Sequence, residues 1–270
     1  MCPSCGTAPA PGVPRCPGCG RQVAAAGGGL DLLDDATREA ADRFALRYSA
    51  LRRQEGWVGK GGREDPEGGD HRLWSERRRS VSEAAAALTG ERPGADRPVV
   101  IDVGSGGGWA ARYLRDADVI AIDLLDTPAH PDVLKVRGDM RCLPLRDGTV
   151  DGALYAASLH YAPVEEAIRE AARVLKPRGL LVAVDSPMYR DGSAQASSEA
   201  RAAAYYARAG FPDLAASYHP IDVMSLRRAL AGSGFEVLRL EPGRSARLWW
   251  ERLRPHRRRS ILVARLPPLA

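Results

Sequence analysis

Four cysteines near the start of the chain stand in two pairs whose spacing suits a metal ion. Cys2 and Cys5 are separated by two residues, and Cys16 and Cys19 repeat that spacing. Two residues between thiols let one turn direct both sulfurs at one ion, so two such turns supply a tetrahedral Zn²⁺ site. A segment of about twenty residues with almost no apolar side chains needs the metal in order to fold. The alternatives are disulfides, which are typical of exported chains, and free thiols.

A second group of residues suited to chemistry is a glycine-rich turn that directly follows the β-branched run Val99–Val103. A strand that ends in such a turn, with a helix expected over 110–114, places backbone N–H groups where open α/β sheets bind nucleotides. Glycine lets the backbone approach the ligand closely. The pattern of dinucleotide-binding proteins, Gly-x-Gly-x-x-Gly or Ala, fits this turn loosely when it begins at Gly106. The run and the turn contribute these candidate ligand-binding positions: Asp102, Gly104, Ser105, Gly106 and Gly108.

Acidic residues follow the next two expected strands. Asp123 ends the run 118–122, and Asp139 follows the run 133–137. An acidic residue at the tip of the strand beside the glycine turn can accept two hydrogen bonds from a ribose diol. The alternative role for Asp123 is that of a helix N-cap.

These motifs resemble those of the class I S-adenosylmethionine (SAM)-dependent methyltransferases. The string from Asp102 to Gly108 is similar to their first motif, and residues 138–151 are similar to the third motif region of the UbiE-like members. The turn at 175–179 is a further match. The resemblance implies a Rossmann-like α/β fold with a seven-stranded, mostly parallel sheet whose last strand is antiparallel. It also implies SAM as cofactor, held by these positions: Asp102, Gly104, Ser105, Gly106, Gly108, Asp123, Leu124, Asp139, Met140, Ala156 and Ser158.

The resemblance assigns particular parts of the cofactor to some of these residues. The first motif would hold the methionine and ribose parts, and Asp139 would hold the adenine amino group. The Cys142 side chain is expected to pack beside the adenine as a small apolar group. His160, just after the expected strand 152–156, is the candidate catalytic residue. It would act either as a general base or as a contact to the methionine tail.

The acceptor is expected to be a small or medium-sized organic molecule. Methyltransferases that act on exocyclic base nitrogens usually carry an Asn/Asp-Pro-Pro-aromatic string at 157–160, and this chain has Ala-Ser-Leu-His there. Aromatic residues after the fifth strand are expected to line an acceptor pocket or to lie in the core. They are Tyr189, Tyr205, Tyr206, Tyr218 and His219.

Alternating apolar runs and amphipathic segments predict the elements that must position these side chains. Strands are expected at 98–103, 118–122, 133–137, 152–156, 180–185, 235–240 and 260–265. Helices are expected at 31–52, 73–88, 164–175 and 222–232. The domains are predicted as a zinc ribbon (1–22), a flexible linker (23–30), a helical lid region (31–97) and the methyltransferase domain (98–270). In the lid region, Tyr48, Trp57, His71 and Trp74 are candidates for the pocket roof or ordinary core aromatics, and 56–70 is expected to be a mobile loop.

Composition limits the partners. The chain has 270 residues and a net charge of +5, which permits contact with nucleic acid without requiring it. No apolar run reaches membrane-spanning length, and no signal peptide is visible, so a cytoplasmic enzyme is expected. One alternative is an rRNA or tRNA methyltransferase that uses the ribbon and the arginine-rich segment 243–259, with Trp249 and Trp250. Another is a non-catalytic SAM-binding scaffold that recruits a protein partner through the ribbon.

Overall fold

The structure of the chain is a computed structural model that describes residues 1–270 other than 11, 26–28, 58–70, 91–95, 128–132, 191, 244–258 and 269–270. Most of the expected mobile loop at 56–70 and of the arginine-rich segment at 243–259 therefore lies outside the described residues. Among the helices of the described part, none combines the length and the apolar character needed to cross a bilayer.

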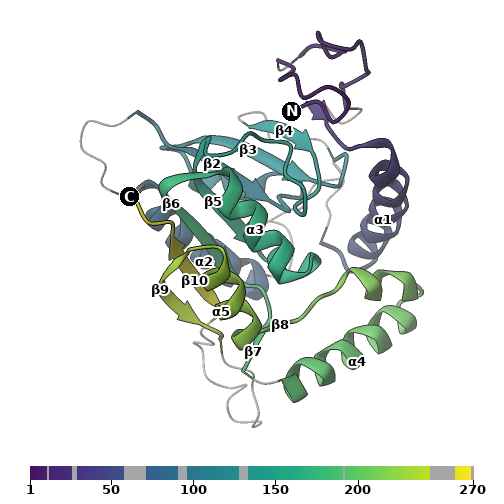
Figure 1. The fold of residues 1–270 in the computed structure, drawn as a ribbon. Coiled ribbons are helices and arrows are strands. Elements are labelled where there is room, and N and C mark those ends of the chain that lie inside the picture. Colours follow the sequence, from purple (N-terminus) through teal and green to yellow (C-terminus); the bar gives the residue numbers. More distant parts are fainter. Residues whose placement is uncertain are drawn as a thin grey trace.

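An eight-stranded sheet forms the centre of the fold (Figure 1). Neighbouring strands are parallel, except that β10 runs antiparallel to both of its neighbours. The Rossmann-like class and the antiparallel last strand are thereby confirmed, with one strand more than the seven predicted. The order across the sheet is β1 (Leu30–Asp31), β4 (Leu134–Arg137), β3 (Asp118–Asp123), β2 (Val99–Val103), β5 (Val150–Ala156), β6 (Leu175–Val184), β10 (Ile261–Arg265) and β9 (Glu236–Glu241).

The additional strand, β1, lies where the sequence predicts a flexible linker and the start of a helix. Leu30 pairs in parallel with Val136 of β4, and Val23 is fully buried. The two ends of the predicted linker, Val23 and Leu30, are therefore packed, whereas Ala24 between them is exposed. The following helix, α1 (Asp35–Gln54), begins later than predicted because the Asp34 side chain accepts a hydrogen bond from the backbone N–H of Thr37 at 2.8 Å and caps it.

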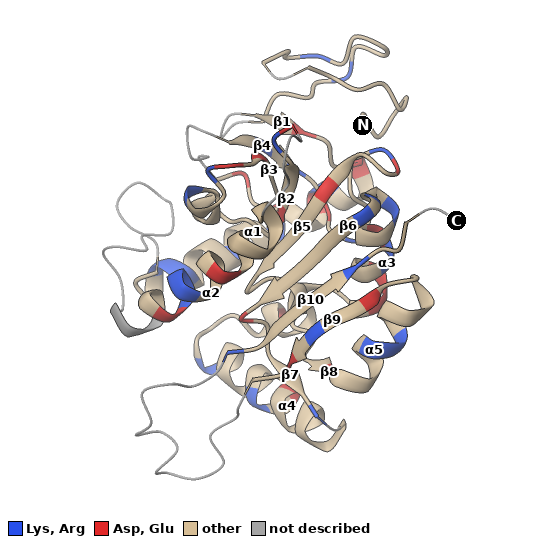
Figure 2. Ribbon diagram, turned by 90° about the vertical axis from the view of Figure 1, so that its left-hand side faces the viewer, with Lys and Arg blue, Asp and Glu red and all other residues tan. Residues whose placement is uncertain are grey.

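Helices cover both faces of the sheet. On one face, α3 (Val164–Val174) and α5 (Val223–Gly232) pack into the main apolar cluster, and on the other α2 (His71–Thr89) packs with a 3-10 helix, η1 (Trp109–Tyr113). The helix predicted at 110–114 is thus a short 3-10 helix, since it starts at a left-handed Gly108 and the chain must enter β3 at Asp118. Figure 2 shows β5, β6 and β10 carrying few charged residues along their length. The apolar face of α3 recurs at helical spacing: Val164, Ala167, Ile168, Ala171 and Val174.

The carboxyl ends of the central strands are covered by three helical segments that we call the cap: α1, α4 (Gly192–Arg208) and η3 (Pro212–Ser217). Leu51 of α1, Tyr206 of α4 and Leu214 of η3 form a separate buried cluster. Arg47 of α1 also pairs with Asp213 of η3 at 2.9 Å. Figure 1 shows α1 and α4 beside one another at one side of the sheet. A small parallel pair, β7 (Met188–Tyr189) and β8 (Ile221–Asp222), flanks α4.

Candidate active site

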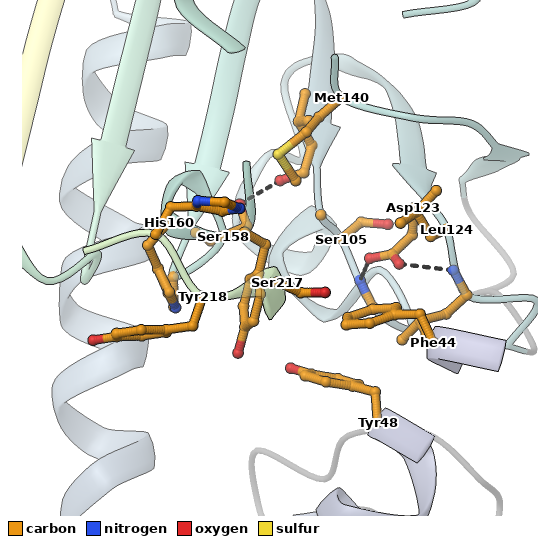
Figure 3. Close-up of a pocket in the computed structure, with 18 of the residues that line it drawn as sticks. Phe44, Tyr48, Ser105, Asp123, Leu124, Met140, Ser158, His160, Ser217 and Tyr218 are labelled. Carbon is orange, nitrogen blue, oxygen red and sulfur yellow. Dashed lines mark hydrogen bonds between the residues drawn. The ribbon is translucent and has the colours of Figure 1, made fainter. Parts of the chain in front are cut away.

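A cavity of about 650 Å³ lies between the cap and the carboxyl ends of the central strands. Figure 3 shows Ser105, Asp123 and Leu124 on one side of it and His160 with Tyr218 on the other, with Phe44 and Tyr48 of α1 opposite the strand ends. Its volume is in the range of pockets that hold small organic ligands. The cavity joins the glycine turn to the aromatic residues in one continuous space.

The glycine turn forms one wall. Gly104 and Gly106 have positive φ angles of 71° and 55°. A side chain at Gly104 would place its Cβ 2.4 Å from the Cβ of Ser158, so the close approach of β2 to β5 requires glycine there. The Gly104 backbone N–H donates to the Ile122 carbonyl at 2.8 Å, which fixes the turn against β3.

Asp123 lies at the tip of β3 and holds the turn in place. One carboxylate oxygen accepts from the Gly106 backbone N–H at 2.7 Å, and the other accepts from the Leu125 N–H at 2.8 Å (Figure 3). A carboxylate oxygen has two lone pairs, so each oxygen can accept a further hydrogen bond from a ligand.

Asp139 lies just beyond β4 and is paired within the chain. Its two carboxylate oxygens accept from the Arg141 guanidinium, one of them at 2.6 Å, and one also accepts from the Arg141 backbone N–H at 2.8 Å. Half of the Arg141 side chain is exposed. A ligand amine at Asp139 would therefore share the carboxylate with Arg141 or displace its side chain.

The structure brings together most of the predicted cofactor and catalytic residues. Asp102 and Gly108 are not among the residues that line the cavity: Asp102 is 1% exposed within β2, and Gly108 lies at the start of η1. The expected place of Cys142 beside the adenine is wrong, because its side chain is exposed outside the cavity. The predicted positions that do line the cavity are Gly104, Ser105, Gly106, Asp123, Leu124, Asp139, Met140, Ala156, Ser158 and His160.

His160 is buried in the short 3-10 helix η2 (Leu159–Tyr161), and its Nδ1 lies 3.4 Å from the Ser186 hydroxyl. Burial, followed by the positive charges of Arg77 and Arg52, lowers the pKa of His160 to about 3. The imidazole is therefore neutral near pH 7. It can donate or accept a hydrogen bond, but it binds a proton weakly.

The side of the cavity opposite the glycine turn is aromatic, and the sequence predicts an acceptor there. All of the aromatic residues predicted after the fifth strand line it, as do Tyr48 and Trp57 of the predicted roof. Trp74 is instead a core residue, 1% exposed and packed against Trp109 with ring centroids 5.3 Å apart. The side chain of His71 lies outside the described residues.

Sequence reasoning misses three basic residues at this site. Lys135 of β4 is buried under the turn, where its Nζ donates to the Gly106 carbonyl and lies 3.2 Å from the Ser105 hydroxyl. A lysine between the apolar residues Leu134 and Val136 of a strand is the signal that could have identified it. Arg52 and Arg77 line the acceptor side from α1 and α2, and nothing in the local pattern of these arginine-rich helices distinguishes them.

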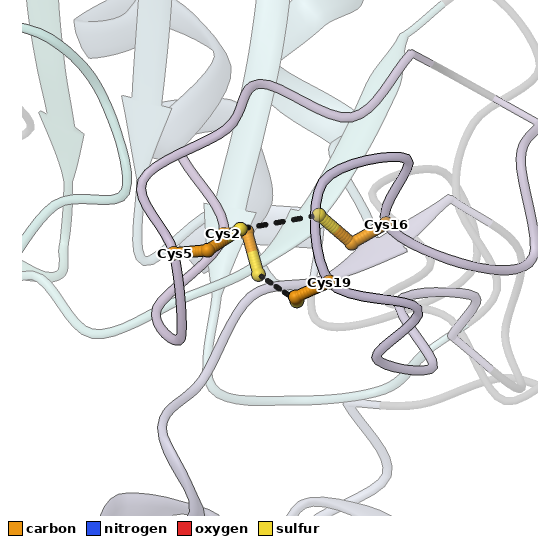
Figure 4. Close-up of side chains that lie close together, drawn as sticks. All are labelled: Cys2, Cys5, Cys16 and Cys19. Atoms are coloured by element: carbon orange, nitrogen blue, oxygen red, sulfur yellow. Dashed lines mark hydrogen bonds between the residues drawn. The ribbon is translucent and has the colours of Figure 1, made fainter.

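The four N-terminal cysteines converge from two loops, as Figure 4 shows. The sulfur atoms of Cys2 and Cys19 lie 3.7 Å apart, and those of Cys5 and Cys16 lie 3.6 Å apart. All four sulfurs are within 4.8 Å of one another. The hydrogen bonds of the Thr7 side chain and backbone lower the pKa of the Cys5 thiol to about 6, which favours the thiolate that a metal requires.

Comparison with known proteins shows that part of the chain is similar to methyltransferases. Residues 101–183 match a family described as a methyltransferase domain. An uncharacterized methyltransferase of Mycobacterium tuberculosis is 38% identical over 90 residues, which cover 30% of this chain and 37% of that protein. The matched segment thus spans little more than a third of the curated relatives.

Solved structures extend the likeness to the whole fold. The [4+2]-cyclase SpnF has a TM-score of 0.57 at 19% identity, with 86% of this chain and 97% of that chain covered. Geranyl diphosphate C-methyltransferase from Streptomyces coelicolor, in complex with Mg²⁺, geranyl diphosphate and S-adenosyl-L-homocysteine, has a TM-score of 0.55 at 14% identity, covering 83% and 97%. By their family match, residues 101–183 are a methyltransferase domain, and the fold around them resembles that of solved methyltransferases.

Proposed function

We propose that this chain transfers the methyl group of SAM to a small or medium-sized organic acceptor that binds beneath the cap. The observation that carries the proposal is the single cavity in which the glycine turn and the strand-end aspartates face a wall of aromatic residues. Cofactor and acceptor would share this space, and the aromatic side suits a planar or apolar molecule better than a duplex.

The residues around the turn fit SAM. The glycine backbone leaves room beside Ser105, and the free lone pairs of the Asp123 carboxylate suit the two hydroxyls of a ribose. Asp139 would accept from the adenine amino group, in competition with Arg141. When bound, SAM supplies an electrophilic methyl group on a sulfonium. The chain's contribution is then mainly to hold the acceptor atom in line with that methyl group.

His160 is proposed as a contact residue. With a pKa of about 3, its neutral imidazole is a poor match for a general base that operates near pH 7. A neutral ring beside Ser186 can instead hydrogen-bond the acceptor or pack against the methionine tail. A dedicated base is not required where the acceptor is already nucleophilic.

The cysteine cluster is proposed to bind one Zn²⁺. Tetrahedral Zn–S bonds of about 2.3 Å place the sulfur atoms about 3.8 Å apart, and the separations of 3.6 and 3.7 Å are close to that value. The cations of the ribbon support a bracing role, because Arg21 pairs with Asp35 and Arg15 donates to the Gly20 carbonyl.

Calorimetry with S-adenosylhomocysteine tests the cofactor site. Wild type is expected to bind one equivalent. Asp123→Ala removes the carboxylate that accepts hydrogen bonds from the turn and is proposed to accept them from the ribose. Binding should weaken at least tenfold, since hydrogen bonds to charged groups contribute about 1.5–3 kcal/mol each. Asp118→Ala, at the exposed start of the same strand, is the matched control and should bind like wild type.

Transfer of labelled methyl groups from SAM to candidate organic acids and phenols then distinguishes the proposed enzyme from the scaffold alternative. Transfer to such a compound supports the proposal. Cofactor binding without transfer to any acceptor would favour the scaffold alternative, and absence of binding by wild type would refute the SAM site itself.

A further inference from the structure

Two arginines stack on one tryptophan in the part of the cavity where the acceptor is proposed to bind. The Cζ atom of Arg52 lies 4.5 Å from the centroid of the Trp57 ring, and that of Arg77 lies 4.7 Å from the same centroid. All three side chains line the cavity. Guanidinium groups stacked on an aromatic ring keep their in-plane N–H donors available, so this arrangement presents donors to a ligand.

The charge of Arg77 is not balanced by an ion pair in the described part of the chain. No carboxylate among the described residues lies within 4.0 Å of its guanidinium, and its Nε is fully buried without a hydrogen-bond partner. Burial lowers the pKa of Arg77. A partly buried guanidinium at a cavity wall, with no carboxylate within ion-pair distance among the described residues, can pair with the negative charge of a ligand.

Arg52 is held in place and partly neutralised. Its guanidinium pairs with Glu55 and donates to the Tyr161 hydroxyl at 3.1 Å. Its Nε is also buried without a hydrogen-bond partner. Arg52 thus provides a fixed second set of donors beside Arg77.

The nearest acidic residue of the cavity does not cancel this charge. Asp185, at the end of β6, accepts from the Ser80 hydroxyl at 2.9 Å and lies 3.5 Å from Arg259. Burial raises the pKa of Asp185, and the charges of Arg259 and Arg77 oppose that shift. Asp185 is thus held by Ser80 and Arg259, which leaves the Arg77 guanidinium without a direct ion pair among the described residues.

We propose that Arg77, assisted by Arg52, binds an anionic group of the methyl acceptor, a carboxylate or a phosphate. The inference rests on the proposed function and narrows its substrate class from organic molecules in general to organic acids or phosphate esters. Guanidinium groups suit both anions because they offer two parallel N–H donors.

An anion could also come from the amino-acid part of the cofactor, but the position favours the acceptor. Arg52 is anchored to Tyr161 beyond β5, and Asp185 beside Arg77 ends β6. The turn and Asp123, which are proposed to hold the cofactor, end β2 and β3. In the sheet order, β5 thus lies between the turn and the end of β6, and both β2 and β5 lie between Asp123 and the end of β6.

The test measures binding of benzoate, phenyl phosphate and neutral benzamide to the protein saturated with S-adenosylhomocysteine. Wild type is expected to bind at least one of the two anions ten times more tightly than benzamide. Arg77→Gln should abolish that preference and leave the affinity for S-adenosylhomocysteine within twofold of wild type. Arg79→Gln, an exposed position on the same helix, is the matched control.

Arg77→Lys is the control for a folding defect, because lysine retains the positive charge and should keep part of the preference for the anions. Equal affinity of wild type for the anions and benzamide would overturn the inference. A tenfold loss of S-adenosylhomocysteine binding in Arg77→Gln would also overturn it, by assigning the arginine to the cofactor. Failure of the proposed function is distinguishable, because wild type would then not bind S-adenosylhomocysteine at all.

Discussion

His160 shows how burial selects the protonation state of a single residue at the cavity. Its imidazole is neutral in the folded chain because burial and the nearby Arg77 and Arg52 lower its pKa to about 3. In the unfolded chain the same group titrates near pH 6.5. Between these values the unfolded state binds a proton that the folded state does not, so the free energy of unfolding falls as the pH falls.

Replacing His160 by Gln should reduce this pH dependence. Gln can keep a hydrogen bond to Ser186 but does not titrate. We expect urea denaturation to show wild type losing more stability than His160→Gln when the pH is lowered from 7 to 5, with no change in the difference between pH 7 and 8. Equal losses of stability in the two proteins between pH 7 and 5 would mean that His160 binds a proton as readily in the folded state as in the unfolded state.

The residues of the site differ in how far local sequence determines them. Asp123 and Asp139 could be predicted because each follows an apolar run, and the ends of parallel strands meet at one edge. Arg52 and Arg77 could not, because which of many arginines on α1 and α2 faces the cavity depends on how those helices pack. Asp102 does not line the cavity for a related reason: alternation along β2 turns its side chain away from the cavity that Val103 lines.

The cysteine cluster is joined to the sheet through β1, which pairs with β4. Cys2 and Cys16 are each 2% exposed and belong to the same buried cluster as Leu143, which follows Asp139. Downstream, the Asp31 backbone N–H donates to the Val23 carbonyl at 2.7 Å, and β1 pairs with β4. Order in the cluster is thereby coupled to the segment that carries Asp139.

Removing the proposed Zn²⁺ should therefore weaken the binding of S-adenosylhomocysteine at a distance. Cys5→Ser, or treatment of wild type with a chelator, is expected to lower the affinity for S-adenosylhomocysteine several-fold, measured by calorimetry together with zinc content. Cys142→Ser is the matched control, because Cys142 is exposed and lies outside the cluster. Unchanged affinity in metal-free protein would show that the cluster and the cofactor site are independent.

Elements with long, consistent patterns could be predicted, and short ones could not. The spacing of apolar residues in α3 identifies both its extent and its buried face. β1 has only two residues, too few for any periodicity to appear, and its conformation depends on pairing with β4. Similarly, η1 differs from the expected helix because its length depends on the distance to β3 rather than on its own residues.

At the scale of the whole molecule, the cap is attached to the sheet domain as a separate unit. Its own cluster of Leu51, Tyr206 and Leu214 does not belong to the two clusters of the sheet. Regions with their own small core open at lower free energy than the main core. The cap is therefore the part of the fold suited to opening for ligand exchange.

Leu51→Ala should loosen the cap while leaving the sheet intact. Leu51 is fully buried, and such truncations cost about 2–5 kcal/mol in the structure that contains them. We expect hydrogen exchange to accelerate in α4 and η3 and to stay unchanged in β5 and β6. Leu46→Ala, at an exposed position of the same helix, is the control. Equal acceleration in the sheet would show that cap and sheet unfold together.

The two-residue strand β1 also has a consequence for solubility. Without it, β4 would be the edge of the sheet, with its backbone N–H and C=O groups open to any passing strand. Leu30 and Asp31 occupy those groups, and the ion pairs of Arg137 with Asp31 and Asp42 place charge along the same border. β1 thus shields this border of the sheet from edge-to-edge self-association, and losing its order would expose an aggregation-prone edge.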